Sequence, residues 1–363
     1  MERATHRTRT VLSLCLLALA GVARRGRAEE VVEEEAAETG PRLELKEALQ
    51  VRIDQGLGAP GAAAVSLRRG RVGLHLAGSP WVRGGLEVSF DRLVLLPGPL
   101  QGPPLTLHEA SATFTVLPQR AWLSVGLFRP QVGRESLTSG FEVDSLDKAI
   151  TQGPLREHLT GTESGRAPGV DVGGLLQGEG WSVRHDSGLV VYRPGPEGAR
   201  RPPLLVARAA LTLGAPEAEA YSLSLPMNDF GLRPGFTLAL QGSTEPGGDA
   251  RSWGVDALLR LRPLVLSAEL HQVASPQGHA LLAHLRAGFN LPGPGATVLE
   301  PWALVARVAG GALEDTPGGA RLDAGLSWYL QRQTLRATLG GSWRPPGHGP
   351  SSGQLGLSLQ HRR

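Results

Sequence analysis

The sequence predicts an all-β protein: a closed antiparallel transmembrane β-barrel of about sixteen strands, with one long loop folded inward. Three observations favour this fold class. Apolar and polar residues alternate with the two-residue period of a β-strand, in segments of about ten residues separated by Gly, Pro and polar turns. The charged residues of these segments fall largely in the polar phase, and the only long apolar run lies at the N-terminus.

An export signal precedes the predicted barrel. Three arginines stand before an apolar run over residues 11–23, which is shorter than the roughly 20 residues that a membrane-spanning helix needs. Small residues follow, and we expect cleavage after Ala28, so that residues 1–28 form a signal peptide. The only cysteine, Cys15, lies in this run. The mature chain would therefore contain neither a disulfide nor a cysteine-ligated metal.

The basic character of the chain belongs to the signal. Six arginines and one glutamate give residues 1–28 a net charge of +5, while the whole chain carries +3, so the mature chain is about −2. This charge gives no reason to expect a nucleic-acid partner. Residues 29–42 contain a run of glutamates and predict an acidic N-terminal tail, which leaves residues 43–363 for the barrel.

The strand pattern repeats sixteen times after the tail. Very short connections at 118–120, 262–263 and 331–333 follow even-numbered strands, as periplasmic turns do, whereas the gaps 214–232 and 290–300 are longer than expected. The predicted strands cover residues 43–54, 64–77, 84–96, 105–117, 121–128, 169–178, 187–194, 203–213, 233–243, 252–261, 264–273, 279–289, 301–310, 319–330, 334–343 and 353–361.

The phase of the alternation assigns the two faces. Leu326, Trp328, Leu339 and Leu357 share the apolar phase and are expected to contact lipid, because a charge facing lipid is costly. A soluble β-sandwich would also alternate, with its apolar residues inside, and stays an alternative. The candidates for lining the lumen are Arg208, Arg260, Arg286, Arg307, Arg321, Arg336, Glu87, Asp91 and Asp323.

The segments 107–115, 123–130 and 135–139 carry a resemblance to a known family. The chain resembles the phosphate-selective porin O and P family, in which a strand pair delivers a glycine, a phenylalanine and a basic residue before a long loop. The matching residues, in order and spacing, are Gly126, Phe128, Arg129, Glu135, Leu137, Thr138 and Ser139. The resemblance implies a porin in the outer membrane of a Gram-negative bacterium, in contact with outer-membrane lipid and assembled as a homotrimer.

The chain also departs from this family. Pro130 and Gln131 stand where the family often has Glu and Pro, the whole chain contains only two lysines, and its C-terminus is not aromatic. Phosphate selectivity is therefore not carried over. What remains is a passive diffusion channel for small hydrophilic solutes and ions. A non-conducting outer-membrane barrel that serves as a scaffold or adhesin is the alternative.

The longest gap between predicted strands, residues 129–168, resembles the family's loop folded into the pore. A constriction sorts ions by sign when charges face each other across a narrow gap of low dielectric constant. Arg129, Arg134 and Lys148 are the candidates for the pore constriction, and together with the predicted strand interiors they favour a weak anion preference. An ordinary hydrophilic surface loop would have the same composition.

The sequence gives little indication of an enzyme. The nine histidines after the signal lack the paired spacing of metal ligands, and no serine stands in a nucleophile elbow. We therefore predict no catalytic residue, no metal and no cofactor. A soluble periplasmic β-rich binding protein is the third class that the pattern leaves open.

Overall fold

A computed structural model describes most of the predicted barrel. The predicted signal peptide over residues 1–28 and most of the predicted acidic tail, residues 29–39, lie outside the described residues. The described residues are 40–57, 63–77, 79–96, 105–118, 120–162, 164–191, 202–276, 278–310, 318–346 and 352–363.

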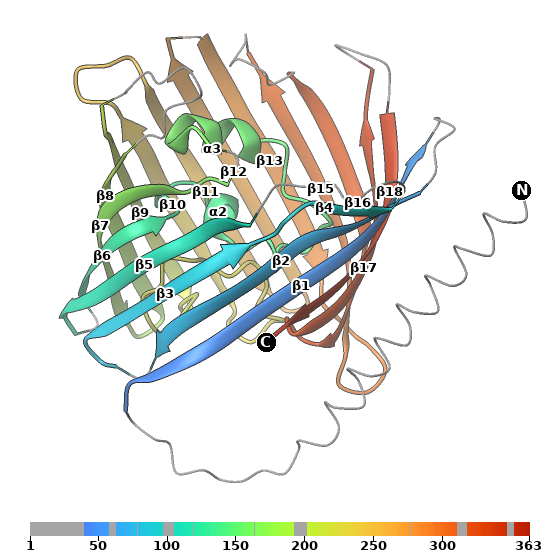
Figure 1. Ribbon diagram of the computed structural model, residues 1–363, viewed down its shortest axis with the longest axis horizontal. Helices are drawn as coiled ribbons and strands as arrows, with labels where there is room; N and C mark the ends of the chain where they lie inside the picture. The colour runs from blue at the N-terminus through green and yellow to red at the C-terminus, as the bar shows by residue number, and fades with distance from the viewer. Residues whose placement is uncertain are drawn as a thin grey trace, which may run out of the picture. The chain divides into compact units, whose positions relative to one another are not determined.

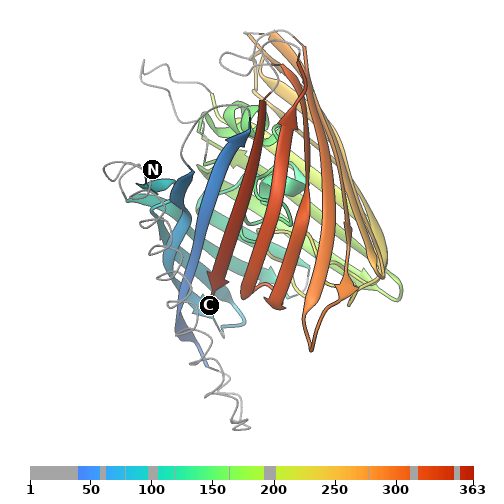
Figure 2. The same ribbon diagram turned by 90° about the vertical axis from the view of Figure 1, so that its right-hand side faces the viewer.

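The strands form one antiparallel sheet that closes on itself. The first strand, β1 (Arg42–Leu57), pairs with the last, β18 (Ser352–Arg362), and the two lie side by side in Figure 2. Two barrel strands are each interrupted. β3 (Val82–Ser89) and β4 (Leu93–Leu96) both pair with β2 (Ala64–Ala77), whereas β13 (Gly278–Phe289) and β14 (Leu291–Pro292) both pair with β15 (Val298–Ala309). The eighteen described segments therefore make a barrel of sixteen strands, which confirms the predicted fold class (Figure 1).

Every predicted strand overlaps an observed one. The largest shift concerns the seventh, predicted at residues 187–194 but observed at 181–190, where successive polar residues hide the alternation. The strands not yet given are β5 (Thr106–Leu117), β6 (Ala121–Phe128), β7 (Ala167–Gly178), β8 (Trp181–Val190), β9 (Leu204–Gly214), β10 (Gly235–Thr244), β11 (Arg251–Leu261), β12 (Leu264–Ser275), β16 (Gly319–Gln331) and β17 (Leu335–Arg344).

The outer face of the barrel is mostly apolar and the inner face mostly polar. On β17, the Leu339 side chain points outward and is 58% exposed, while its neighbour Thr338 points inward and is 3% exposed. Leu326, Trp328 and Leu357 are also exposed, as their phase predicts. Because a soluble sandwich would bury these leucines, the structure contradicts the sandwich alternative and favours an outer face that contacts lipid.

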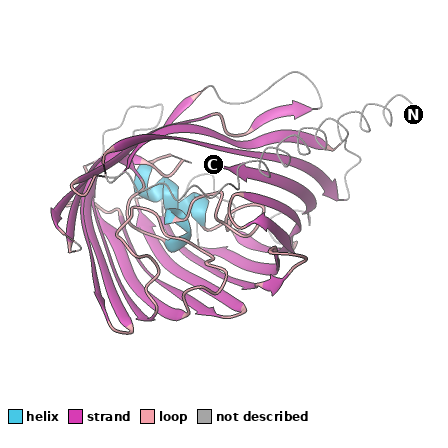
Figure 3. Ribbon diagram, turned by 90° about the horizontal axis from the view of Figure 1, so that it is seen from below, coloured by secondary structure: helices cyan, strands magenta, loops and turns pink. Residues whose placement is uncertain are grey.

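Two loops occupy the interior. The first, residues 129–166, is called the inward loop here and carries the short helices α2 (Arg134–Leu137) and α3 (Gln152–Thr160), which Figure 3 shows inside the ring of strands. It packs through an apolar cluster against the inner faces of β8, β9, β12, β13 and β15. The second, residues 215–234, is called the opposite loop because it joins β9 to β10 at the other end of the barrel.

Helix formation contributes little to this fold. No helix in the described part of the chain is long and apolar enough to cross a membrane. Side-chain contacts with the wall hold the inward loop in place.

Candidate functional site

A row of arginines lines the inner face of β1 and β2. Arg52, Arg69 and Arg71 point inward and are almost fully buried. The pairing of β1 with β2 shifts its register at this point, so that Arg68 is an extra residue in β2. Such a bulge re-aims a side chain. Two neighbouring arginines, Arg68 and Arg69, can therefore both reach the interior, which strict alternation forbids.

The tip of the inward loop is bound to this row through Asp147. Its carboxylate accepts hydrogen bonds from Arg52 at 2.5 Å and from Arg68 at 2.7 Å. Burial favours a higher pKa for Asp147, but the attraction of Arg68 and Arg52 outweighs it and holds the pKa below its ordinary value. The carboxylate is therefore ionised at neutral pH and neutralises part of the arginine row.

Further along β2, Arg71 contacts both the loop and the wall. Its guanidinium group lies 5.0 Å from the centre of the Phe141 ring, on the inward loop. It also lies 3.3 Å from the carboxylate of Asp91 and 3.8 Å from that of Glu87. The structure thus brings two of the three predicted lumen carboxylates, Glu87 and Asp91, to the same arginine.

Arg134 holds the inward loop to the opposite loop. Its side chain is completely buried. It donates two hydrogen bonds of 2.8 Å to Glu217 of the opposite loop and one of 2.9 Å to Asp256 of β11, which Arg208 also contacts. Burial favours a higher pKa for Glu217, but Arg134 lowers it to about 2. Both members of the pair are therefore charged at neutral pH.

The next residue of the loop, Glu135, is bound to the wall. Its carboxylate accepts a 2.7 Å hydrogen bond from Arg286, and His284 lies 3.1 Å away. Burial disfavours the charged form, yet Arg286 and His284 hold the pKa of Glu135 below its ordinary value. Lys148 donates hydrogen bonds to three backbone carbonyls of the same loop, those of Glu135, Ser136 and Thr138.

A third contact lies at Asp144. Tyr329 of β16 donates a 2.6 Å hydrogen bond to Glu300 and lies 3.2 Å from the carboxylate of Asp144. Asn228 of the opposite loop donates to Glu300 at 2.9 Å. Burial raises the pKa of Asp144. The inward loop, the opposite loop and the wall thus meet at one hydrogen-bonded cluster.

The three predicted constriction residues have different surroundings. Arg129 donates to the carbonyls of Leu137 and Thr138 at 2.9 and 3.2 Å and lines a cavity in the lumen. Arg134 is fully paired with carboxylates, and Lys148 is bound to backbone carbonyls, so neither lines the two cavities described below. Both hold the inward loop in shape.

Eight of the nine predicted lumen residues lie on the inner side of the wall or contact a side chain there. Arg208, Arg286 and Arg336 are buried under the loops. Arg260 contacts Asp229 of the opposite loop at 3.3 Å. The remaining four are Arg321, Asp323, Glu87 and Asp91. Asp91 is placed on the inner side by its contact with Arg71.

Arg307 is the exception, because it lies on the outer face and is exposed. Its strand, β15, is apolar in both phases, so alternation does not decide which set faces inward. The inner set includes Leu304 and Ala306, which pack against Ala149 and Ile150 of the inward loop. This contact fixes the phase and turns Arg307 outward, which corrects the prediction that it lines the lumen.

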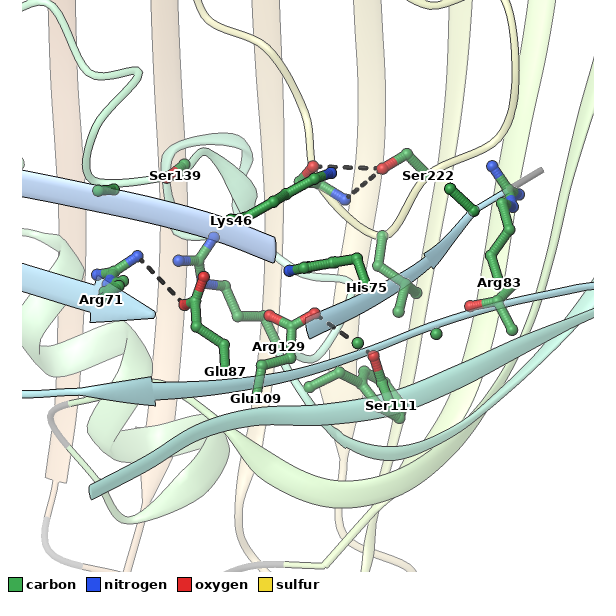
Figure 4. A pocket seen from close by; sticks show the side chains of 18 of the residues that line it. Lys46, Arg71, His75, Arg83, Glu87, Glu109, Ser111, Arg129, Ser139 and Ser222 are labelled. Carbon is green, nitrogen blue, oxygen red and sulfur yellow. Dashed lines mark hydrogen bonds and ion pairs between the residues drawn. The ribbon is translucent and has the colours of Figure 1, made fainter. Parts of the chain in front are cut away.

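Two cavities remain beside the inward loop. The larger has a volume of about 420 Å³ and lies between β1, β2, β3 and β5 on one side and both loops on the other (Figure 4). The smaller, of about 280 Å³, lies between the loop tip and the strands β1 and β15–β18. The larger is lined by seven basic residues, Lys46, Arg71, Arg83, Arg129, Arg166, Arg362 and Arg363, and three acidic ones, Glu47, Glu87 and Glu109.

The described residues contain no group of three or more His, Cys, Asp or Glu side chains that could hold a metal ion. The buried histidines are used in other ways. His284 contacts Glu135, and His271 lies 3.2 Å from the carboxylate of Glu269. Both histidines therefore lie against carboxylates within the wall and the inward loop.

Solved outer-membrane porins have the same fold. The OmpF of Salmonella typhi, in complex with daunomycin, aligns with a TM-score of 0.59 at 12% identity, over 90% of this chain and 98% of that one. An anion-selective porin from Comamonas acidovorans aligns with a TM-score of 0.58 at 12% identity, over 89% of this chain and 100% of that one. At these identities the likeness shows that the chain has the porin fold. Neither a protein-family model nor a curated protein matches the sequence.

A loop-deletion mutant of OmpT from Vibrio cholerae aligns less closely, with a TM-score of 0.52 at 8% identity over 89% of this chain and 99% of that one. These likenesses extend over nearly the whole barrel. The finer resemblance to the phosphate-selective porin O and P family stays a prediction.

The sequence pattern did not identify two parts of the site. The arginine row has a signal in the sequence, because three arginines fall within four residues at 68–71, but the bulge that turns two neighbours inward does not. The opposite loop appeared only as a gap that was too long for a periplasmic turn. Its apolar residues Tyr221, Leu225 and Met227, which are buried, could have suggested an inward fold.

Proposed function

We propose that this chain is a porin in the outer membrane of a Gram-negative bacterium, a passive diffusion channel for small hydrophilic solutes with a weak preference for anions. The single observation that carries the anion preference is the charge of the larger cavity, with seven basic and three acidic lining residues. An excess of one sign along a low-dielectric wall raises the local concentration of the opposite ion.

The rest of the proposal follows from the fold. The apolar outer face supports contact with outer-membrane lipid, and export through a signal peptide at residues 1–28 accounts for the location. A homotrimer is the assembly that we propose from the family resemblance. The channel needs no cofactor and no catalytic residue, because diffusion through a water-filled pore breaks no bond.

Reversal potentials under a KCl gradient in planar bilayers test the proposal. We expect a reversal potential whose sign indicates a preference for anions. The preference should fade as the salt concentration rises, because screening shortens the reach of the wall charges to roughly 3 Å at 1 M. Arg129→Gln should weaken the preference, because Arg129 lines the larger cavity. Arg307→Gln removes the same charge from the outer face and should leave the potential unchanged. A cation preference in the unmodified protein would contradict the proposal.

The filling of the lumen by two loops favours a second candidate, a non-conducting barrel that serves as a scaffold or adhesin. The contacts of Arg134, Glu135, Asp144 and Asp147 leave the inward loop bound to the wall at several points. Under this alternative, purified protein that inserts into bilayers produces no current steps. Current steps of uniform size decide for the channel.

A further inference from the structure

The basic residues of the larger cavity outnumber the carboxylates that could neutralise them. Glu87 lies 3.8 Å from Arg71 and 3.5 Å from His108, and Glu109 lies 3.5 Å from Arg166. Both carboxylates are therefore already engaged with the wall and the inward loop.

Among the described residues, three guanidinium groups of this cavity, those of Arg83, Arg129 and Arg363, have no carboxylate within 4.0 Å, whereas Arg71, Arg166 and Arg362 are paired. Arg83 projects from β3 and has no ion pair there. Arg129 donates only to backbone carbonyls of its own loop. Figure 4 shows Lys46, Arg71 and Arg129 near one another, contributed by two strands and the inward loop, with Arg83 on the far side of the cavity. Positive charge thus converges on the cavity from several sides.

Burial makes this excess of positive charge unfavourable. The pKa of Arg129 is lowered by burial and by the neighbouring charge of Arg71, and burial and Arg129 lower the pKa of Arg166 in the same way. The Nε atoms of Arg71, Arg129 and Arg166 are buried without a hydrogen-bond partner. A bound anion would offset this repulsion.

The cavity also has apolar walls. Leu223 of the opposite loop and Phe141 of the inward loop line it together with the cations. An inorganic oxyanion makes no favourable contact with such surfaces, whereas a solute with a hydrocarbon body and one carboxylate makes both kinds of contact. A volume of about 420 Å³ is sufficient for a small aromatic acid.

We propose that the larger cavity is a binding site for small organic carboxylates, with Arg129 contacting the carboxylate and Leu223 and Phe141 contacting the hydrocarbon body. The proposal rests on the diffusion channel proposed above and names the solute class that the channel recognises. It ranks an organic carboxylate above both its neutral analogue and an inorganic anion.

Isothermal titration calorimetry on the full chain folded in detergent tests the site without requiring conduction. The probes are sodium benzoate, benzamide and inorganic phosphate at equal ionic strength, each corrected with empty micelles. We expect saturable binding of benzoate, and binding of benzamide and phosphate that is at least about tenfold weaker. Arg129→Gln should weaken benzoate binding about tenfold, because one charged hydrogen-bond donor is lost. Arg307→Gln, on the outer face, should not change it.

The outcomes separate this site from the proposed channel. Three results overturn the site: phosphate that binds as tightly as benzoate, equal benzoate affinity in Arg129→Gln and the unmodified protein, or no benzoate binding. A conducting protein without benzoate binding overturns the site alone. Benzoate binding with the expected ranking, in a protein that forms no current steps, retains the site and overturns the channel. Benzoate that reduces the single-channel current over the same concentration range as it binds supports both.

Discussion

The ion pair between Arg134 and Glu217 is predicted to hold the two inner loops together. The Arg134 side chain is 0% exposed and that of Glu217 is 10% exposed, so the pair is shielded from water. Removing one member of a buried pair costs about 3–5 kcal/mol, because the other charge stays buried without its partner. Glu217→Gln keeps the shape of the side chain and removes its charge, and so tests the charge alone.

The same loop offers a matched control. Glu219 pairs with Arg233 at 2.8 Å, but its side chain is 86% exposed, and an exposed pair is worth about 0–1 kcal/mol. We therefore expect Glu217→Gln to lower the midpoint of thermal unfolding in detergent, measured by heat-modifiable migration on a gel, and Glu219→Gln to leave it almost unchanged. Single-channel records of Glu217→Gln should also show larger current fluctuations, since the opposite loop is released from the lumen.

The pH dependence of this pair has a definite sign. Arg134 depresses the pKa of Glu217 in the folded state to about 2, from an ordinary value of 4.5. The pair therefore stabilises the fold fully above the ordinary pKa, and its contribution is lost as the pH falls from about 4.5 towards 2. Equal unfolding midpoints for Glu217→Gln and Glu219→Gln at neutral pH would refute the reasoning, because they would show that the buried pair adds nothing to the exposed one.

Three further predictions concern the wall and the inward loop. Leu339→Arg places a charge against lipid and should impair refolding in bilayers by about 2–4 kcal/mol, whereas Ser342→Arg, on the inner face of the same strand, should not. Burial raises the folded-state pKa of Asp144, so the fold favours its neutral form and the contact with the wall weakens as the carboxyl ionises at higher pH. Current noise should therefore increase with pH, and Asp144→Asn should abolish that increase. Asp147→Asn removes the counter-charge of two arginines and should shift the reversal potential towards stronger anion preference.

The barrel was predictable because lipid and water impose the same two-residue period on every strand. Leu326, Trp328 and Leu339 have charged or hydroxyl neighbours in the opposite phase, and the structure turns them outward as that pattern requires. Where both phases are apolar, as around Arg307 on β15, the pattern carries no such information. There the packing of Leu304 and Ala306 against the inward loop decides, and that contact joins residues more than a hundred positions apart.

The roles of the loop cations could not be predicted for a related reason. Arg129, Arg134 and Lys148 have the same formal charge, yet only Arg129 lines a cavity, while Arg134 is paired with Glu217 and Lys148 is bound to carbonyls. These differences arise from partners on β11, on the opposite loop and on neighbouring turns of the inward loop. A count of charges in one segment therefore does not give the charge that a solute meets.

The wall strands and the ends of the inward loop, and not the loop as a whole, set the ion preference. The inward loop contains more acids than bases, which by itself would favour cations. Asp147 is bound to Arg52 and Arg68, however, and Glu135 is bound to Arg286, so the strands neutralise these two acids. The net charge of the larger cavity is then set by the basic residues of β2, β3 and the ends of the inward loop. Their charges exceed those of Glu87 and Glu109. Selectivity should accordingly respond to substitutions in the wall at Arg83 more than to those at Arg134, because only Arg83 lines the cavity.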